Sequence, residues 1–213
     1  MLMAYRETTH TKTRKQTQHA NILAAARQRI ASGGYQAAQM QALAQDCGIA
    51  TGTVYRYFPS KADLFAEVFR LAVQAEVDAV DAAAHGAGTP EQRLQAVITT
   101  FVRRALRAPR LAYALLAEPM DPLVESERLV FRQSYAQVIE EVLNSGIADG
   151  VFADQNPKLS AAALVGLMNE TLVGPLSPTP QSEIPERYSD VQEVELTNAI
   201  IALCMRAVTG RSF

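Results

Sequence analysis

Hydrophobic residues recur at helical spacing along nearly the whole chain. Ile22, Ala26 and Ile30 share one face of a predicted helix that stops at the glycine pair of residues 33 and 34. The same periodicity predicts a short helix over residues 40–46, another after residue 50, and a long helix from residue 60 to about 84. Later helices are predicted from residue 90 and over about 110–117, 123–145, 157–173 and 190–209.

Two segments interrupt this pattern. Residues 82–90, AAAHGAGTP, form a joint, and residues 173–186 contain four prolines, which favours a long loop. No run alternates with the period of two that a strand requires. The chain is therefore predicted to be all-α, with about three short helices, one long connector and a larger helical bundle.

The composition is typical of a soluble globular protein. The 213 residues are 48% hydrophobic and 20% charged, and no apolar run reaches the roughly 18 to 20 residues that span a bilayer. The first residues lack the apolar segment of a signal peptide. Cys47 and Cys204 match no metal or redox spacing. We therefore expect a reduced, cytoplasmic protein that does not associate with a membrane.

The charge is divided unevenly along the chain. Residues 1–70 contain nine Lys or Arg and four acids, a net charge of +5, whereas the remainder has a net charge of −7. An excess of positive charge at one end favours a polyanionic partner there and a different task for the rest of the chain.

The segment from Met40 to Pro59 has the pattern of a helix-turn-helix motif. A small residue, Ala44, is predicted to face the partner helix, and Gly48 is predicted to take the conformation of the turn. Leu43, Cys47, Ile49 and Val54 are predicted to form the small core that the two helices share. Each feature is weak by itself, but together they indicate the motif.

The second helix of this motif presents a polar outer face. With Val54 directed inward, Gly52 and Arg56 point away from the core, and Thr53 and Tyr55 flank them. Hydroxyl groups, a guanidinium and a position without a side chain suit the major groove of DNA. The alternative is an ordinary solvated surface.

At these residues the chain resembles the TetR family, the tetracycline-repressor-like regulators. The resemblance covers Ile22 to Phe65 and is most specific in the segment GTVYRYFPSK, residues 52–61. It implies a three-helix DNA-binding domain followed by a larger ligand-binding and dimerisation bundle. The implied DNA contacts are Gln39, Gln41, Thr51, Gly52, Thr53, Tyr55, Arg56, Tyr57 and Lys61.

The resemblance also suggests how the chain is divided. We predict a flexible polar arm at residues 1–15 and a helix-turn-helix domain at 16–65, whose connector helix continues to about 84. An effector-binding and dimerisation domain would follow at 90–213. The arm segment THTKTRK, residues 9–15, either contacts phosphate or the minor groove or is an unstructured tail.

The bundle contains no catalytic constellation. All three histidines, His10, His19 and His85, precede it, so it lacks a histidine-based acid–base pair or metal site. We therefore predict no enzyme activity, no catalytic residues, no cofactor and no metal.

Apolar and aromatic residues inside the bundle are the candidates for an effector pocket. They either line a cavity or simply fill the core, and the resemblance to TetR favours a cavity. The candidate pocket residues are Phe101, Tyr113, Leu116, Phe131, Tyr135, Val138, Leu167, Met168, Asn169, Thr171 and Leu172.

The last two helices are predicted to form a dimer. The first carries small residues that allow close approach of another helix, and the second is apolar on more than one face. The candidate interface residues are Ala162, Gly166, Leu196, Ile200, Leu203 and Cys204. Burial of these helices within a monomer is the alternative.

These expectations define a homodimeric, ligand-responsive transcriptional regulator. It is expected to repress transcription by binding a palindromic operator in double-stranded DNA, and a small hydrophobic or aromatic effector would release it. The alternatives are a transcriptional activator and an effector-binding helical protein that does not bind DNA.

Overall fold

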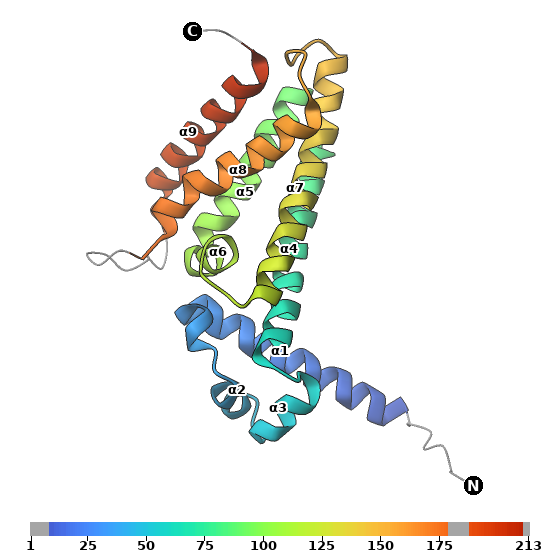
Figure 1. Ribbon diagram of the computed structural model, residues 1–213. Helices are drawn as coiled ribbons and strands as arrows, with labels where there is room; N and C mark the ends of the chain where they lie inside the picture. Colours follow the sequence, from blue (N-terminus) through green and yellow to red (C-terminus); the bar gives the residue numbers. More distant parts are fainter. Residues whose placement is uncertain (1–8, 179–187, 211–213) are drawn as a thin grey trace.

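A computed structural model describes residues 9–178 and 188–210, and every regular element within these ranges is an α-helix. Figure 1 shows a small N-terminal part from which α4 rises into a larger bundle. The helices are α1 (Thr9–Ala37), α2 (Met40–Asp46), α3 (Thr51–Tyr57), α4 (Lys61–Ala84), α5 (Pro90–Arg107), α6 (Pro109–Leu116), α7 (Pro122–Ala148), α8 (Pro157–Leu176) and α9 (Asp190–Thr209). The predicted all-α architecture with its long connector is confirmed, although α1, at 29 residues, is longer than the short helix predicted.

Helix α1 begins earlier than predicted. Residues 9–15, which we assigned to a flexible arm, form its first turns, and the side chains of Lys12, Arg14 and Lys15 are exposed. The helical periodicity was not visible there because residues 12–15 are all exposed. Residues 1–8 of the predicted arm lie outside the described residues.

Helix α1 has a kink at Gly34, where the backbone adopts a left-handed conformation with φ of 73°. A side chain at this position would be strained, and its Cβ would lie 3.1 Å from a carboxylate oxygen of Glu118. Glycine therefore permits the close approach of α1 to the end of α6. The kink also places Tyr35 in the core, where its ring packs edge-on against Phe65 at 4.5 Å.

The connector α4 belongs to both parts of the molecule. Near its start it packs against α1, and further along it lies against α5 and α7 (Figure 1). Its buried side includes Leu64, Phe65 and Val68 at the DNA-binding end and Val73 and Val80 within the bundle. One continuous core therefore joins the two parts.

Local sequence signals fix where the helices of the bundle start. Thr89 and Gln92 form a reciprocal capping box before α5, and Ser189 and Gln192 form another before α9. A proline occupies the first turn of α5, α6, α7 and α8, where its missing N–H costs no intrahelical bond.

The proline-rich loop begins later than predicted, because α8 continues through Pro175 to Leu176. Most of this loop, residues 179–187, lies outside the described residues. Contrary to our reading of the sequence, α8 is long and apolar enough, by length and composition, to cross a membrane. In the structure it packs against α6, α7 and α9.

The predicted dimer residues divide into two groups. Ala162, Gly166 and Leu203 are exposed on α8 and α9, as an interface requires. Ile200 and Cys204 are only 2% and 0% exposed within a single subunit. Their assignment to the dimer interface stays a prediction; within one subunit α9 packs on α5.

Leu196 is half-buried against the core and lies between the two groups. The outer surface of these helices is nevertheless apolar. The exposed large side chains on it are Leu159, Val191, Val194 and Leu203.

Candidate nucleic-acid interface and ligand cavity

Helices α2 and α3 form the predicted helix-turn-helix. The turn is closed by hydrogen bonds from the Cys47 N–H to the Leu43 carbonyl at 3.0 Å and from the Ile49 N–H to the Ala44 carbonyl at 2.9 Å. Gly48 has a φ of 63°, the left-handed conformation that the turn was predicted to need. Val54 is fully buried, which fixes the rotation of α3 about its axis.

The opposite side of α3 is open. Tyr55 is 47% exposed and Arg56 is also exposed, whereas Thr51, Thr53 and Tyr57 are half-buried. A Cβ added to Gly52 would meet no atom within 4 Å, so another molecule can approach the backbone there. The structure therefore brings the predicted residues of α3 onto one short helix with an accessible polar face.

The two glutamines predicted to contact DNA lie at the start of α2. Gln41 is exposed, and Gln39 is the residue that precedes the first turn. The side-chain amide of Gln39 donates a hydrogen bond to the carbonyl of Gln36 at 2.8 Å. Gln39 is thus held by the end of α1, while Gln41 has no such restraint among the hydrogen bonds within the described chain.

Lys61 lies differently from the sequence-based prediction. Ser60 caps α4, accepting a hydrogen bond from the Asp63 N–H at 3.1 Å. The Lys61 ammonium, however, lies 4.4 Å from the centroid of the Tyr35 ring and 5.3 Å from that of Phe65. Burial lowers the pKa of Lys61, opposed by the charge of Glu118. To reach a phosphate, this side chain would have to leave the two rings.

Sequence reasoning missed a contact that fixes α1 against the end of α3. The ring of His19 stacks on Phe58, with 4.7 Å between the ring centroids. Its Nε2 atom lies 3.4 Å from a carboxylate oxygen of Glu67 on α4. His19 therefore connects three helices of the N-terminal part, and no short motif in the sequence indicates this role.

The bundle contains a cavity of about 70 Å³ between α4, α5, α6, α7 and α8. Its walls are mostly apolar. The lining residues are Phe69, Val73, Glu76, Phe101, Arg104, Ala105, Ala108, Leu111, Ala112, Leu115, Leu116, Arg128, Phe131, Arg132, Tyr135 and Asn169.

Five predicted pocket residues line this cavity: Phe101, Leu116, Phe131, Tyr135 and Asn169. The other six, Tyr113, Val138, Leu167, Met168, Thr171 and Leu172, do not line it, and their assignment to an effector pocket stays a prediction. Met168 and Leu172 are almost completely buried in the core. The Thr171 hydroxyl donates to backbone carbonyls of its own helix. Helical periodicity identifies a buried face but does not distinguish a packed core from a cavity wall.

Sequence reasoning also missed the contribution of α4 and the charged groups. Phe69, Val73 and Glu76 come from the connector, which we had read only as a link. Glu76 and Arg104 form a two-point ion pair, with 2.9 Å between the Glu76 Oε1 and Arg104 Nη2 atoms. The adjacent rings of Phe101 and Tyr135 pack edge to face at 5.3 Å.

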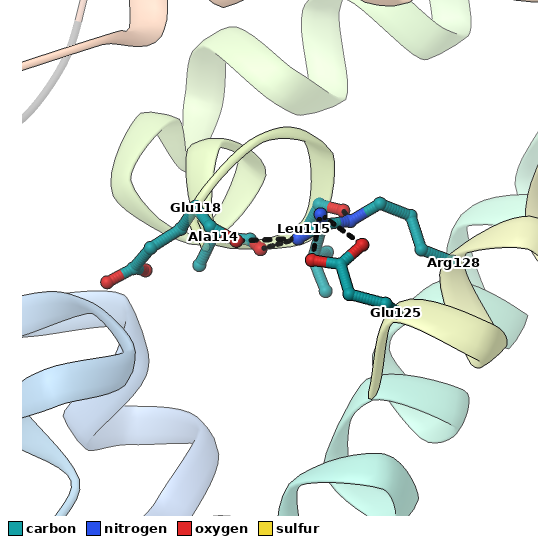
Figure 2. A network of polar contacts seen from close by, with 5 residues as sticks. All are labelled: Ala114, Leu115, Glu118, Glu125 and Arg128. Carbon is teal, nitrogen blue, oxygen red and sulfur yellow. Dashed lines mark hydrogen bonds and ion pairs between the residues drawn. The ribbon is translucent and has the colours of Figure 1, made fainter. Parts of the chain in front are cut away.

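Arg128 joins the cavity to the end of α6. Its guanidinium donates hydrogen bonds to the carbonyls of Leu115 and Glu118, both at 2.9 Å, and to that of Ala114 at 3.2 Å. It also pairs with Glu125, with 2.7 Å between Nη1 and Oε1. These bonds satisfy carbonyls at the C-terminal end of α6 that its own helix leaves without a partner (Figure 2).

Glu118 continues this network toward the DNA-binding end. Its side chain points away from Arg128 and toward α1 (Figure 2). The two carboxylate oxygens accept the backbone N–H of Tyr35 at 3.1 and 3.0 Å. The residue is therefore bonded through its carbonyl to a cavity-lining arginine and through its carboxylate to the kink of α1.

An accessible polar recognition helix joined by a long connector to a bundle with an internal cavity defines a helical DNA-binding regulator. Two family models match the chain. One describes bacterial regulatory proteins of the tetR family and matches residues 22–68, and the other describes the tetracyclin repressor-like C-terminal domain and matches residues 87–173. The chain belongs to the TetR family of transcriptional regulators, which confirms the resemblance.

Individual relatives match the chain to different extents. The HTH-type transcriptional repressor KstR of Mycolicibacterium smegmatis is 42% identical over 84 residues, 39% of this chain and 41% of the relative. The match to this repressor therefore spans about two fifths of its length. The fatty acid metabolism regulator protein of Bacillus subtilis is 23% identical over 161 residues, 74% of this chain and 83% of the relative.

A solved structure has the same fold. The transcriptional regulator FadR from Bacillus subtilis, in complex with stearoyl-CoA, superposes with a TM-score of 0.71 at 20% sequence identity. The superposition covers 89% of this chain and 98% of the FadR chain. At this level of sequence identity the likeness concerns the fold.

Proposed function

We propose that this chain is a ligand-responsive transcriptional repressor that binds a palindromic operator as a homodimer and is released by a small effector. The observation that carries the proposal is the open polar face of α3, which lies opposite the buried Val54. The KstR relative is named a transcriptional repressor, which supports repression rather than activation. The cytoplasm is the compartment in which such a regulator meets DNA.

In the proposed complex, α3 enters the major groove. Arg56 would pair with base edges, and the hydroxyls of Thr51, Thr53 and Tyr55 would reach bases or phosphates. Gly52 would let the backbone approach closely, while Tyr57 and the two glutamines of α2 would contact the DNA at the margins. Lys61 would join them only after leaving the Tyr35 ring.

The proposed dimer uses the outer surface of α8 and α9. On α8 this surface consists of Leu159 followed by the small residues Ala162, Ala163 and Gly166. Small residues allow two helices to approach closely, and a second copy of the chain presents the same surface. The dimer would hold two α3 helices about 34 Å apart, the spacing of successive major grooves.

The proposed effector site is the cavity between α4 and α8. Helix α4 contributes Phe69, Val73 and Glu76 to its wall and also packs on α1, so it can transmit a change in the cavity to the DNA-binding end. The path through Arg128, Glu118 and Tyr35 provides a second connection. An effector would act by binding more tightly to a conformation in which the two α3 helices are wrongly spaced.

The proposal is tested by DNA binding of the full-length protein. A labelled duplex from the region upstream of its own coding sequence is titrated at several salt concentrations, and fluorescence anisotropy is measured. We expect binding that weakens by roughly 10³ to 10⁵ between 50 and 200 mM salt, as for six to ten phosphate contacts. A scrambled duplex of equal length is the control. Equal affinity for both duplexes would contradict the proposal.

A further inference from the structure

The cavity contains a buried amide without a partner. Asn169 is only 8% exposed, and its Oδ1 atom is buried with no hydrogen bond to any residue in the described part of the chain. The side chain lines the cavity from α8. Buried polar groups are almost always paired, and leaving one unpaired destabilises the fold. A ligand that donates a hydrogen bond to this amide would remove that penalty.

A second polar group lines the cavity from a neighbouring helix. Tyr135 on α7 is also 8% exposed, and its hydroxyl makes no hydrogen bond within residues 9–178 and 188–210. Burial raises the pKa of Tyr135, so the hydroxyl stays protonated and can donate. Asn169 as acceptor and Tyr135 as donor together match a ligand hydroxyl, which both donates and accepts.

The charges that line the cavity do not balance. Arg104 pairs with Glu76, and Arg128 pairs with Glu125. Arg132, four residues after Arg128, forms no ion pair with any described residue and is exposed where it lines the cavity. One positive charge on the cavity wall therefore has no acidic partner among the described residues. An acidic group on a ligand would neutralise this charge.

The size and the walls of the cavity favour a single ring. Phe69, Phe101 and Phe131 line it together with Tyr135, and aromatic walls favour aromatic ligands through edge-to-face packing. The volume of about 70 Å³ is far below the roughly 300 Å³ at which drug-sized pockets begin. A ring can enter with a small outward movement of the helices, whereas a long acyl chain requires a much larger one.

We propose that this cavity binds a small aromatic carboxylic acid that carries a ring hydroxyl. The hydroxyl faces Asn169 and Tyr135, the ring lies among the phenylalanines, and the carboxylate faces Arg132. The proposal rests on the proposed function only for the claim that this ligand is the effector, because binding itself can be measured without DNA.

The experiment compares three matched compounds by isothermal titration calorimetry on the full-length protein. They are 3-(4-hydroxyphenyl)propionate, 3-phenylpropionate, which lacks the hydroxyl, and 4-propylphenol, which lacks the carboxylate. We expect the first to bind about tenfold more tightly than each of the others, the effect of one buried hydrogen bond or one exposed charge interaction. This comparison between ligands does not depend on the folding of any variant.

Two variants assign the effects to residues. Asn169→Leu should remove the preference for the hydroxylated acid over 3-phenylpropionate and should raise the melting temperature of the free protein, because it replaces an unpaired polar group. Arg132→Gln should remove the preference for the acid over 4-propylphenol. Asn144→Leu and Arg107→Gln, at exposed positions outside the cavity wall, are the matched controls and should retain both preferences.

The outcomes separate this inference from the proposed function. Equal affinity for the three compounds, no binding of any of them, or binding of stearoyl-CoA alone would overturn the inference. Operator binding is then measured by anisotropy with and without the hydroxylated acid. Selective binding of the acid without release of DNA would support the ligand site but contradict the role of the acid as the effector. Failure to bind any duplex would overturn the proposed function alone.

Discussion

Helix α3 carries its candidate binding groups on the side that faces solvent, whereas the helices around the cavity carry theirs on the side that faces the core. On α3 the candidate DNA-binding residues Tyr55 and Arg56 are exposed while Val54 is fully buried, so recognition and stability depend largely on different residues. In the cavity the same side chains, such as Phe101 and Phe131, form both the core and the binding wall. The DNA-binding surface can therefore change without loss of the fold, whereas the ligand site cannot.

The two regions also differ in how they are held. The orientation of α3 follows from the turn at Gly48, from contacts with α2, and from the ring of His19 on α1, which lies beside Tyr57. The cavity is assembled by helices separated by as many as 100 residues in the sequence, from Phe69 on α4 to Asn169 on α8. Glu118, which bonds to Arg128 and to Tyr35, is a polar link between the cavity wall and α1.

The largest expected effect comes from a change that touches neither binding region. Ala162→Glu places a charge on the exposed small-residue surface of α8 and should prevent the proposed dimer. Because two linked α3 helices bind DNA far more tightly than one, operator affinity should fall by about 10²- to 10⁴-fold. Sedimentation velocity measures the oligomeric state, and fluorescence anisotropy measures the operator affinity. Gln95→Glu, exposed on α5, is the control, and a dimeric Ala162→Glu protein would contradict the assignment of this surface.

A pair of substitutions two residues apart tests the separation of stability from recognition on α3. Arg56→Ala should weaken operator binding by about 1 to 3 kcal/mol, or roughly 5- to 150-fold, with an unchanged melting temperature. Val54→Ala should instead destabilise the fold, because it creates a cavity at a fully buried position. Arg107→Ala, at an exposed position of α5, is the matched control. A destabilised Arg56→Ala protein would show that the two roles are not separate.

The smallest expected effect concerns the link between the regions. Glu118→Gln replaces a charged acceptor of the Tyr35 N–H with a neutral one and removes the carboxylate near Lys61, so the free energy of unfolding should fall by about 1 kcal/mol. Urea denaturation measures this change. Glu140→Gln, on α7 and without an ion pair among the described residues, is the control. An equal effect of both substitutions would mean that the carboxylate of Glu118 has no special role.

The sequence by itself determined the elements and the DNA-binding end. Helical periodicity, capping residues such as Ser60 and Thr89, and Gly48 in its turn are local signals, and local physics suffices to interpret them. The exposed face of α3 could be predicted from a helical wheel of this segment alone. Once Val54 is buried, the rotation of so short a helix about its axis is fixed.

Only the tertiary structure decided which buried residues surround the cavity and which face of α9 stays exposed. Leu172 and Phe131 have the same helical pattern, but one is packed in the core and the other lines the cavity. Cys204 and Leu203 are neighbours in sequence, yet one contacts the core and the other remains on the surface. Periodicity specifies that a side chain is buried, whereas the packing of distant helices decides what lies against it.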